Sequence, residues 1–539
     1  MKKFLFLILL FSNITFVLAQ EDAWVYLTDK PDVSASIANP ITILTQKAID
    51  RKTAHNVSID ERDVPVNEAY ISQLKLQTGI TVMAKSKWLN AVHVRGTETD
   101  INALSALSFV NSIEFANHSL NGTSRLSGNN QHQNKFDTED ALENFNYGDT
   151  FNQIEMFNGD ALHVQNYTGQ GMTVAVLDAG FPNVNTMAAF QRLRDAGNLL
   201  GGYDFVNRTP ISYSEHYHGT MVLSTLAGYV QDQFVGTAPD AQYYLFRTEN
   251  ASSENPVEES YWVEAAERAD SLGVDVINTS LGYTTFDNSN YDYIPDDMNG
   301  TTAFISRGAN IAMEKGLLLI NSAGNEGGST WQIVAAPADA PGVLTVGAVD
   351  ATGNYASFSS TGSSAQTVQK PDVVAQGQAS YVITPTDVIT TANGTSFSSP
   401  ILAGGVVCLW QALPTLSNTE IMQLVRESAS QYSTPDHFLG YGIPDLQQAL
   451  ATGLSVVDYQ NQSNAFSIYP NPVTDRLYVN APIGGPVRID VFDVLGKLVK
   501  RASLNSNSDW ISVKALSKGI YIAKVRASNF SRTIKLIKE

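Results

Sequence analysis

The chain has 539 residues, 53 of them acidic and 34 basic, for a formal net charge of −19. One hydrophobic core rarely serves more than about 250–300 residues, so we expect about three or four structural units. With 43% hydrophobic and 16% charged residues, the composition excludes collagen-like and disordered classes. Phosphate groups repel so acidic a chain, and we expect no nucleic-acid partner.

Residues 1–19 show the pattern of a secretory signal peptide. Lys2 and Lys3 precede a short apolar run at 4–11, and the small residue Ala19 ends a candidate cleavage site. The alternative is a retained anchor, but Ser12 and Asn13 interrupt a run that is too short to span a bilayer. We expect an exported chain with no transmembrane segment in its mature form.

The single cysteine, Cys408, lies in a run of apolar residues. An exported chain with one thiol has no internal disulfide. We expect Cys408 to be a buried, inert thiol on an apolar helix rather than a nucleophile.

Residues 20–116 indicate a small α+β module, and residues 117–151 a linker. Strands are predicted at 23–27, 80–84, 91–94 and 110–115, with helices at 66–77 and 101–107. The stretch 117–134 is polar and cannot bury a core, which favours an exposed linker.

Residues 152–455 alternate short apolar runs with amphipathic helices such as 263–272 and 302–315. The runs VAVLD, VDVINTS, GLLLINS and VLTVGAV are almost continuously apolar, as strands of a parallel sheet covered on both faces must be. The block is therefore predicted to be a doubly wound α/β sheet. Ligands of such sheets lie beyond the carboxyl ends of the strands.

Residues 466–539 consist of short alternating strands spaced by about eight to twelve residues, with turns at 484–485 and 495–496, which indicates a small β-sandwich. We find no catalytic cluster in it.

Three polar residues in the α/β block form a candidate nucleophilic constellation. Asp178 ends a predicted strand, His218 opens a helix, and Ser396 precedes an apolar helix. A serine hydroxyl needs a base to remove its proton, and an imidazole base needs an acceptor on its other nitrogen. Singly, each residue is more often structural: a strand-ending Asp, a common His-Gly-Thr, a Ser as N-cap. The order Asp, His, Ser is one known order for such a triad.

The blocks VAVLDAG, HGTMV, SAGNEG and GTSFSSP, in this order, resemble the hallmark blocks of the subtilisin-like serine peptidases, the peptidase S8 family. The resemblance covers about 153–450. It implies a secreted serine endopeptidase that hydrolyses peptide bonds through an acyl-enzyme, with Asp178, His218 and Ser396 as its triad.

The resemblance also implies residues that bind the substrate. Asn325 matches the family's oxyanion-hole asparagine, whose amide donates to the negative oxygen of the tetrahedral intermediate. Ser280, Leu281 and Gly282 match the segment that pairs with substrate backbone and forms one wall of the S1 pocket, and Gly324 lies in the opposite wall. Substrate then binds as an added β-strand.

The sequence signals for a metal, a cofactor or a charged subsite are weaker than those for the triad. His216 and His218 have no third ligand at metal-binding spacing, so we assign no metal. We expect catalysis to need no cofactor; a structural calcium ion fits the family but cannot be assigned to residues. An acidic segment containing Glu249, Glu254, Glu258 and Glu259 lies where the family lines pockets upstream of S1. It could favour basic substrate side chains, but a solvated acidic loop is the favoured interpretation.

The flanking segments fit the same resemblance. Residues 20–116 are similar in position and pattern to a peptidase propeptide, which implies a zymogen. The tail, with YPNP at 469–472 and KGIY at 518–521, resembles the C-terminal sorting domain of Bacteroidetes proteins. It implies the type IX secretion machinery as a partner, and a protein secreted from, or attached to the surface of, a Gram-negative cell. A generic adhesive β-domain is the alternative.

Two other functions were weighed. A non-catalytic binding protein on the same scaffold would usually lack one of the four polar catalytic residues, and all four are present. A lipase-type acyl hydrolase would place its serine in a G-x-S-x-G elbow, which is absent around Ser396. We expect a monomer that acts on protein or peptide substrates.

Overall fold

The computed structural model describes residues 20–121, 145–464, 467–480, 487–504, 510–527 and 530–539. The predicted signal peptide, most of the predicted linker and the predicted turn at 484–485 lie outside these ranges. The chain divides into two compact units, Met1–Gln447 and Gln448–Glu539.

The N-terminal module of the first unit is a four-stranded antiparallel sheet in the order β2-β3-β1-β4. All four predicted strands form, as β1 (Gln20–Leu27), β2 (Thr81–Ser86), β3 (Ala91–Thr97) and β4 (Val110–Phe115). The predicted helices correspond to α3 (Glu68–Lys75) and to α4 (Glu98–Ala103) with its 3-10 continuation. The alternation of apolar residues was therefore sufficient to find this sheet.

Two helices of the module, α1 (Val33–Ala38) and α2 (Gln46–Ala54), were not predicted. The buried residues of α2 are Ala48, Arg51 and Lys52, so two of its three core-facing side chains are charged. A search for apolar periodicity cannot find a helix whose buried face is ionic.

The α/β block forms an eight-stranded sheet, as predicted. Every neighbouring pair is parallel except β6 with β7, which is antiparallel. In spatial order the strands are β14 (Val373–Gln376), β13 (Val343–Val349), β12 (Leu318–Ser322), β11 (Val276–Thr279), β5 (Thr173–Asp178), β10 (Gln242–Arg247), β6 (Leu199–Asp204) and β7 (Thr209–Pro210).

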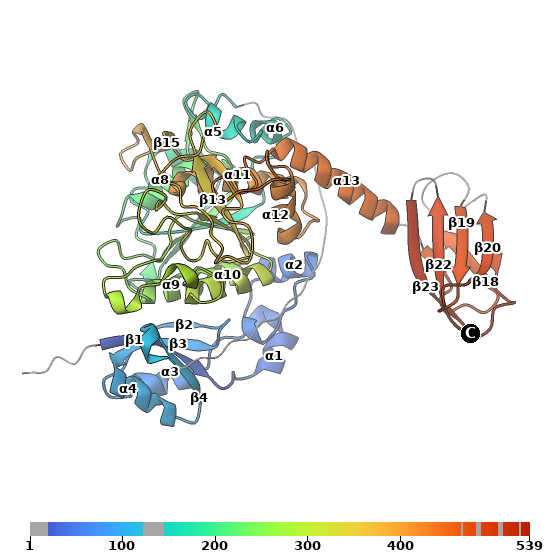
Figure 1. Cartoon of the computed structure of the whole chain (residues 1–539), viewed down its shortest axis with the longest axis horizontal. Helices are drawn as coiled ribbons and strands as arrows, with labels where there is room; N and C mark the ends of the chain where they lie inside the picture. The colour runs from blue at the N-terminus through green and yellow to red at the C-terminus, as the bar shows by residue number, and fades with distance from the viewer. Residues whose placement is uncertain (1–19, 122–144, 465–466, 481–486, 505–509, 528–529) are drawn as a thin grey trace, which may run out of the picture. The chain divides into compact units, whose positions relative to one another are not determined.

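Helices cover both faces of this sheet (Figure 1). The long helices α8 (His218–Ala227) and α11 (Thr395–Ala412) lie on one face, and α9 (Val257–Leu272) and α10 (Phe304–Glu314) on the other. Strands β5, β11, β12, β13 and β14 are buried at every residue, which is why their sequences are almost continuously apolar. Cys408 is buried in α11, as predicted, and burial raises the pKa of its thiol. The remaining elements are α5 (Phe151–Glu155), α6 (Asp160–His163), α7 (Gln191–Asp195), α12 (Asn418–Glu427), α13 (Leu446–Asn464), and the strand pairs β8 (Tyr229–Val230) with β9 (Phe234–Val235) and β15 (Ser380–Ile383) with β16 (Ile389–Ala392).

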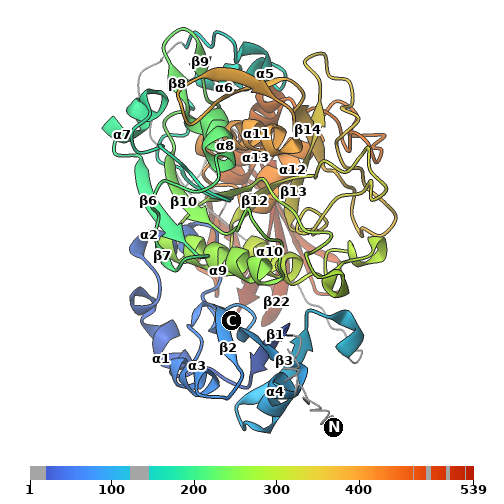
Figure 2. The same cartoon turned by 90° about the vertical axis from the view of Figure 1, so that its left-hand side faces the viewer.

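The N-terminal module packs against α9 and α10, which lie between its sheet and the large sheet (Figure 2). Trp24 of β1 stacks on Phe304 of α10 with ring centroids 4.6 Å apart. Its indole nitrogen donates to the hydroxyl of Ser260 in α9 at 2.8 Å. The contact thus combines apolar packing with a specific hydrogen bond.

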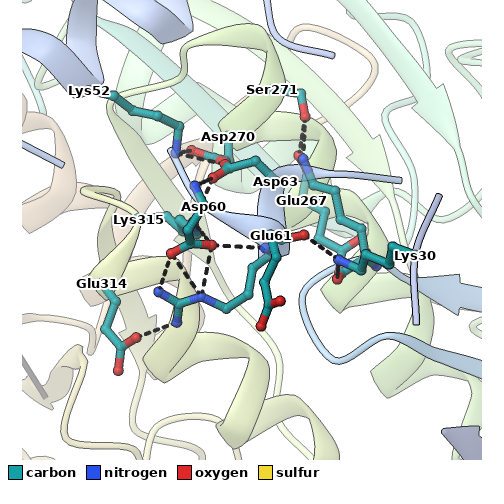
Figure 3. Close-up of polar contacts among 12 residues, drawn as sticks. Lys30, Lys52, Asp60, Glu61, Asp63, Glu267, Asp270, Ser271, Glu314 and Lys315 are labelled. Carbon is teal, nitrogen blue, oxygen red and sulfur yellow. Dashed lines mark hydrogen bonds and ion pairs between the residues drawn. The ribbon is translucent and has the colours of Figure 1, made fainter. Parts of the chain in front are cut away.

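A buried ionic network lies in the same contact (Figure 3). Lys52 Nζ lies 2.8 Å from Asp270 Oδ1 and 3.3 Å from Asp63 Oδ1, and Lys315 Nζ lies 2.6 Å from Asp63 Oδ2. These four side chains are at most 1% exposed; Lys52 and Asp63 come from the module, and Asp270 and Lys315 come from the α/β block. Since burying a charge is costly, the two parts are stable together only while every charge keeps its partner.

We expect Asp270→Asn to destabilise the first unit by about 3–5 kcal/mol, because it leaves Lys52 and Arg51 buried beside a neutral group. Urea unfolding of the full chain with and without the substitution measures the loss. Glu314→Gln is the matched control, since its ion pair with Arg62 is about one-third exposed and should contribute about 0–1 kcal/mol. Equal effects of both substitutions would contradict the role of the buried network.

The second unit is a β-sandwich, as predicted. Its antiparallel sheets, β17-β18-β21 and β20-β19-β22-β23, share one apolar core that includes Leu477, Ile489 and Ala523. Among the helices of the described residues, none combines the length and apolar character needed to cross a membrane. The strands are β17 (Ser467–Tyr469), β18 (Arg476–Asn480), β19 (Val487–Phe492), β20 (Leu498–Leu504), β21 (Trp510–Ser512), β22 (Gly519–Ala527) and β23 (Phe530–Lys538).

Candidate active site

The candidate site lies at the carboxyl ends of the central strands. Asp178 is the last residue of β5, Ser280 follows β11 directly, and Asn325 comes three residues after β12. Two helix N-termini meet this edge, because His218 is the first residue of α8 and Ser396 the second residue of α11. The side chains along these buried strands are mostly apolar, so the polar groups that can meet a ligand collect where the strands end.

Asp178 holds the imidazole of His218. The Nδ1 atom of His218 lies 2.9 and 3.0 Å from the two carboxylate oxygens. Asp178 is only 2% exposed, and its Oδ1 also accepts the backbone N–H of Ala179 at 2.7 Å. The close approach of the start of α8 to the segment after β5 requires glycine at position 219. A Cβ there would lie 2.4 Å from the carbonyl oxygen of Gly180.

The surroundings of His218 favour its protonated form. Burial lowers the pKa of the imidazole, but the charge of Asp178 and its hydrogen bond outweigh that effect and raise the pKa above its ordinary value. An imidazole that gains stability on protonation is suited to accept a proton.

Pro400, four residues after Ser396, changes the hydrogen bonding of the first turn of α11. Pro400 has no N–H, so the carbonyl of Ser396 lacks its usual partner inside α11. The hydroxyl of Ser280 donates to this carbonyl instead, at 3.0 Å. In return, the hydroxyl of Ser396 donates to the carbonyl of Ser280 at 3.3 Å. These two bonds join the start of α11 to the end of β11.

The structure therefore brings Asp178 and His218 into contact but does not join His218 to Ser396 by a hydrogen bond. Among the described residues, the Ser396 hydroxyl donates to Ser280 alone. The ring centroid of His218 lies 6.0 Å from that of Phe397, the residue that follows Ser396 in the chain. Catalytic hydrogen bonds are often long before substrate binds, so this geometry is compatible with a proton relay.

The amide of Asn325 is oriented by Thr395. Its Oδ1 accepts the backbone N–H of Thr395 at 2.9 Å and the Thr395 hydroxyl at 3.0 Å. This leaves the Nδ2 donor directed away from Thr395, with no hydrogen-bond partner in the described part of the chain. Gly394 has φ of +150°, and a Cβ there would lie 3.6 Å from Asn325 Nδ2 and 3.7 Å from the backbone nitrogen of Ser396. Two donors therefore border one small space.

The predicted substrate-binding segment has free backbone donors. Within the described ranges, the N–H groups of Leu281 and Gly282 form no backbone hydrogen bond, and the ladder resumes only at Tyr283 with Ala336. Gly324, in the predicted opposite wall, has φ of +105° and donates its N–H to the Thr395 hydroxyl at 3.1 Å. An extended peptide can pair with the edge at Leu281 and Gly282.

Residues 169–442, just over half of the chain, match the profile of the Subtilase family. Subtilisin DY of Bacillus licheniformis is 29% identical over 298 residues, which are 55% of this chain and 97% of that protein. Subtilisin of Bacillus pumilus is 30% identical over 55% of this chain and 97% of its own length, and subtilisin E of Bacillus subtilis is 30% identical over 55% and 70%. The chain belongs to the subtilase family.

The subtilase is a secreted serine-type endopeptidase. Residues 22–135 match the peptidase S8 propeptide domain of Bacteroidota, and residues 467–539 match the secretion system C-terminal sorting domain. The resemblance stated from sequence is thereby confirmed, together with a protein that is secreted or attached to the cell surface. Its substrates are proteins or peptides, and its sorting tail is that of the type IX route.

Sequence reasoning missed the residues that position this site in the subtilase. The sequence analysis assigns no role to Thr395 of the GTSFSSP block, although this residue orients Asn325. Arg247, at the end of β10, is 4% exposed and donates to the carbonyls of Ala179 and Glu249 and to the carboxylate of Asp204. The available signal was a polar residue at the end of an apolar strand, which the sequence analysis used only for Asp178.

The prediction of a solvated acidic loop is wrong. Glu259 is fully buried in α9 and accepts the hydroxyl of Tyr293 at 2.8 Å and the N–H of Ile305 at 2.9 Å. Burial, with charges of neighbouring carboxylates, raises the pKa of Glu249 to about 7, of Glu254 to about 8 and of Glu258 to about 9. Glu249, Glu258 and Glu259 belong to the packed structure, because their carboxylates accept hydrogen bonds from residues of several segments.

Carboxylate oxygens of Glu249, Glu254 and Glu258 lie within 4.8 Å of one another, the one such group among the described residues. Calcium takes six to eight oxygen ligands. Both oxygens of Glu258 already accept backbone N–H groups at 2.7 Å, and both oxygens of Glu249 accept hydroxyls. The group therefore does not fit a calcium site. Neither His216 nor His218 belongs to it.

We expect the subtilase to lose stability as pH rises from about 5 to 9, and Glu254→Gln to reduce that loss. The folded chain holds the Glu254 proton up to about pH 8, whereas the unfolded chain releases it above about pH 4.3. The folded state thus binds more protons across this range, so its stability falls with pH. The melting temperature should fall by about 2–4 °C less between pH 6 and 9 in the variant. Glu427→Gln, at an exposed position on α12, is the control, and an equal change there would contradict the assignment.

Proposed function

We propose that Asp178, His218 and Ser396 form the catalytic triad of this endopeptidase and that Asn325 forms its oxyanion hole. The observation that carries the proposal is the hydrogen-bonded pair of buried Asp178 and partly exposed His218, at the same sheet edge as Ser396. Ser396 is the second residue of an 18-residue helix, whose N-terminal dipole favours negative charge next to the serine.

In the first step, His218 Nε2 takes the proton of the Ser396 hydroxyl while the oxygen attacks the carbonyl carbon of the scissile bond. Asp178 stabilises the imidazolium that results. His218 then gives the proton to the leaving nitrogen, the C–N bond breaks, and an acyl-enzyme is left on Ser396. Water repeats the sequence, which releases the acid product and restores the serine.

The negative oxygen of each tetrahedral intermediate is bound by Asn325 Nδ2 and the backbone N–H of Ser396. The hydrogen bonds from Thr395 support this assignment, because they fix the amide with its donor outward before substrate arrives. Donors that are held in place do not have to reorganise during the reaction.

Substrate binds as an extended strand along Ser280, Leu281 and Gly282, with Gly324 in the opposite wall of the S1 pocket. The unpaired N–H groups of Leu281 and Gly282 support this mode. Recognition through backbone groups selects extended or unfolded segments of protein.

We further propose that residues 20–116 act as a propeptide which the peptidase removes itself, after loss of a signal peptide at 1–19. The linker of 117–151 would contain the cleavage site, residues 152–455 would form the active peptidase, and residues 466–539 would direct secretion. The protein acts as a monomer, and its catalysis requires no cofactor.

Ser396→Ala should reduce peptide hydrolysis by about 10⁶-fold, and His218→Ala by a similar factor, with the double variant little worse, because the triad acts as a unit. Hydrolysis of a chromogenic peptide measures the loss. Ser398→Ala is the matched control, since its hydroxyl caps the Thr395 carbonyl in the same turn. The Ser396→Ala chain should also keep residues 20–116. Normal trimming would assign processing to another protease, and near-normal hydrolysis would refute the triad.

Asn325→Ala should lower kcat by about 10²–10³-fold with little change in KM, because the amide acts on the transition state. Gly394→Ala should cause a comparable loss, since its methyl group would enter the space between the two donors. Asn354→Ala, at an exposed position, is the control. A variant of Asn325 with raised KM and normal kcat would show a role in substrate binding instead.

A further inference from the structure

A cavity of about 430 Å³ lies between helix α2 of the N-terminal module and the peptidase block. The module contributes Arg51 and His55, and the peptidase contributes Met172, Asp275 and Trp410. Its walls therefore come from two parts of the chain that proteolytic processing would separate.

The module side of this cavity has buried donors without acceptors. Arg51 is 6% exposed and His55 is 9% exposed. Arg51 Nη2 donates to Asp270 and to the carbonyl of Lys315, but within the described residues its Nε and Nη1 have no hydrogen-bond partner, nor has Nδ1 of His55. Burial and the charge of Arg51 lower the pKa of His55 to about 4, so its ring is neutral. An unpaired buried donor costs about 1–3 kcal/mol, so the two Arg51 nitrogens favour an acceptor such as a carboxylate, as does His55 in the tautomer that carries its proton on Nδ1.

The same cavity also has acidic and apolar walls. Asp50 lies on the exposed side of α2, and Asp275 follows Val274 ahead of β11, 3.9 Å from Lys47 Nζ. The ring of Trp410 lies 5.5 Å from that of His55, and Met172 adds further apolar surface. The cavity thus combines donors for an anion, carboxylates for a cation and a surface for hydrocarbon.

We propose that this cavity binds a small zwitterion with an α-ammonium and a carboxylate group, namely a free amino acid or dipeptide with an apolar side chain. The carboxylate pairs with Arg51 and His55, and the ammonium group faces Asp50 and Asp275. Such molecules are end products of complete protein hydrolysis, in which an endopeptidase makes the peptides that exopeptidases then shorten, so the endopeptidase activity contributes to their supply. The proposal depends on that activity only for the source of the ligand.

Because both walls are needed, the ligand binds only while the N-terminal module is docked. A ligand that binds one state alone stabilises that state in proportion to its concentration. Accumulating products would therefore hold the module on the peptidase and delay its release.

Calorimetric titration of the full-length Ser396→Ala chain with leucine tests the proposal. We expect saturable binding at one site and a rise in melting temperature of a few degrees at about 100 times Kd. N-acetylleucine lacks the ammonium group and leucinamide lacks the carboxylate, so each should bind at least about 10-fold more weakly. The dipeptide Gly-Leu distinguishes a site for dipeptides from one for single amino acids. The mature enzyme without the module should not bind leucine.

Two variants locate the site. His55→Phe keeps a ring against Trp410 but removes the Nδ1 donor, and Arg51→Lys keeps a cation near Asp270 but removes Nε and Nη1. Each should weaken leucine binding by about 10-fold or more, with circular dichroism confirming the fold. Lys85→Ala, in the module but away from the cavity, is the control. Absence of leucine binding, equal binding by the mature enzyme, or unchanged binding by both variants would overturn the proposal.

Discussion

The site depends on one constraint, which is that the strands of a parallel sheet buried on both faces carry mostly apolar side chains, so that polar groups collect near the strand ends. Strands β5, β11 and β12 end side by side, so Asp178, Ser280 and Asn325 are brought to one edge. Helices α8 and α11 begin at this edge and present His218 and Ser396. Because each residue is attached to a buried strand or a long helix, the site is rigid before substrate binds.

Local bonds then set the orientation of each group. Because Pro400 has no N–H, the carbonyl of Ser396 has no partner within α11, and the Ser280 hydroxyl donates to it instead. A residue predicted to contact substrate therefore also holds the start of α11 in place. Thr395 fixes the amide of Asn325 in the same way. The proposed substrate-pairing segment, the proposed nucleophile and the proposed oxyanion donor are therefore coupled through neighbouring atoms. A substitution at Ser280 would disturb all three.

The N-terminal module is held by contacts of a different kind. Its apolar surface, with Trp24 on Phe304, is combined with the buried charges of Lys52, Asp270 and Lys315. Buried ion pairs add little net stability over an apolar contact, but they penalise any arrangement that leaves one charge unpaired. The interface therefore favours one docked geometry. Separation also becomes feasible, because the charged groups regain water when the module leaves.

The sequence by itself determined the order and type of most elements, the family, and the candidate residues at strand ends, because continuous apolar runs and short motifs are local signals. It did not determine α2, whose buried face carries Arg51 and Lys52, because ionic burial follows from partners more than 200 residues away. It gave the wrong environment for Glu259, since only the tertiary structure brings Tyr293 and Ile305 to that carboxylate. The outward amide of Asn325 was likewise decided by Thr395, 70 residues later in the chain. Contacts between distant segments leave no local pattern, so only the folded chain reveals them.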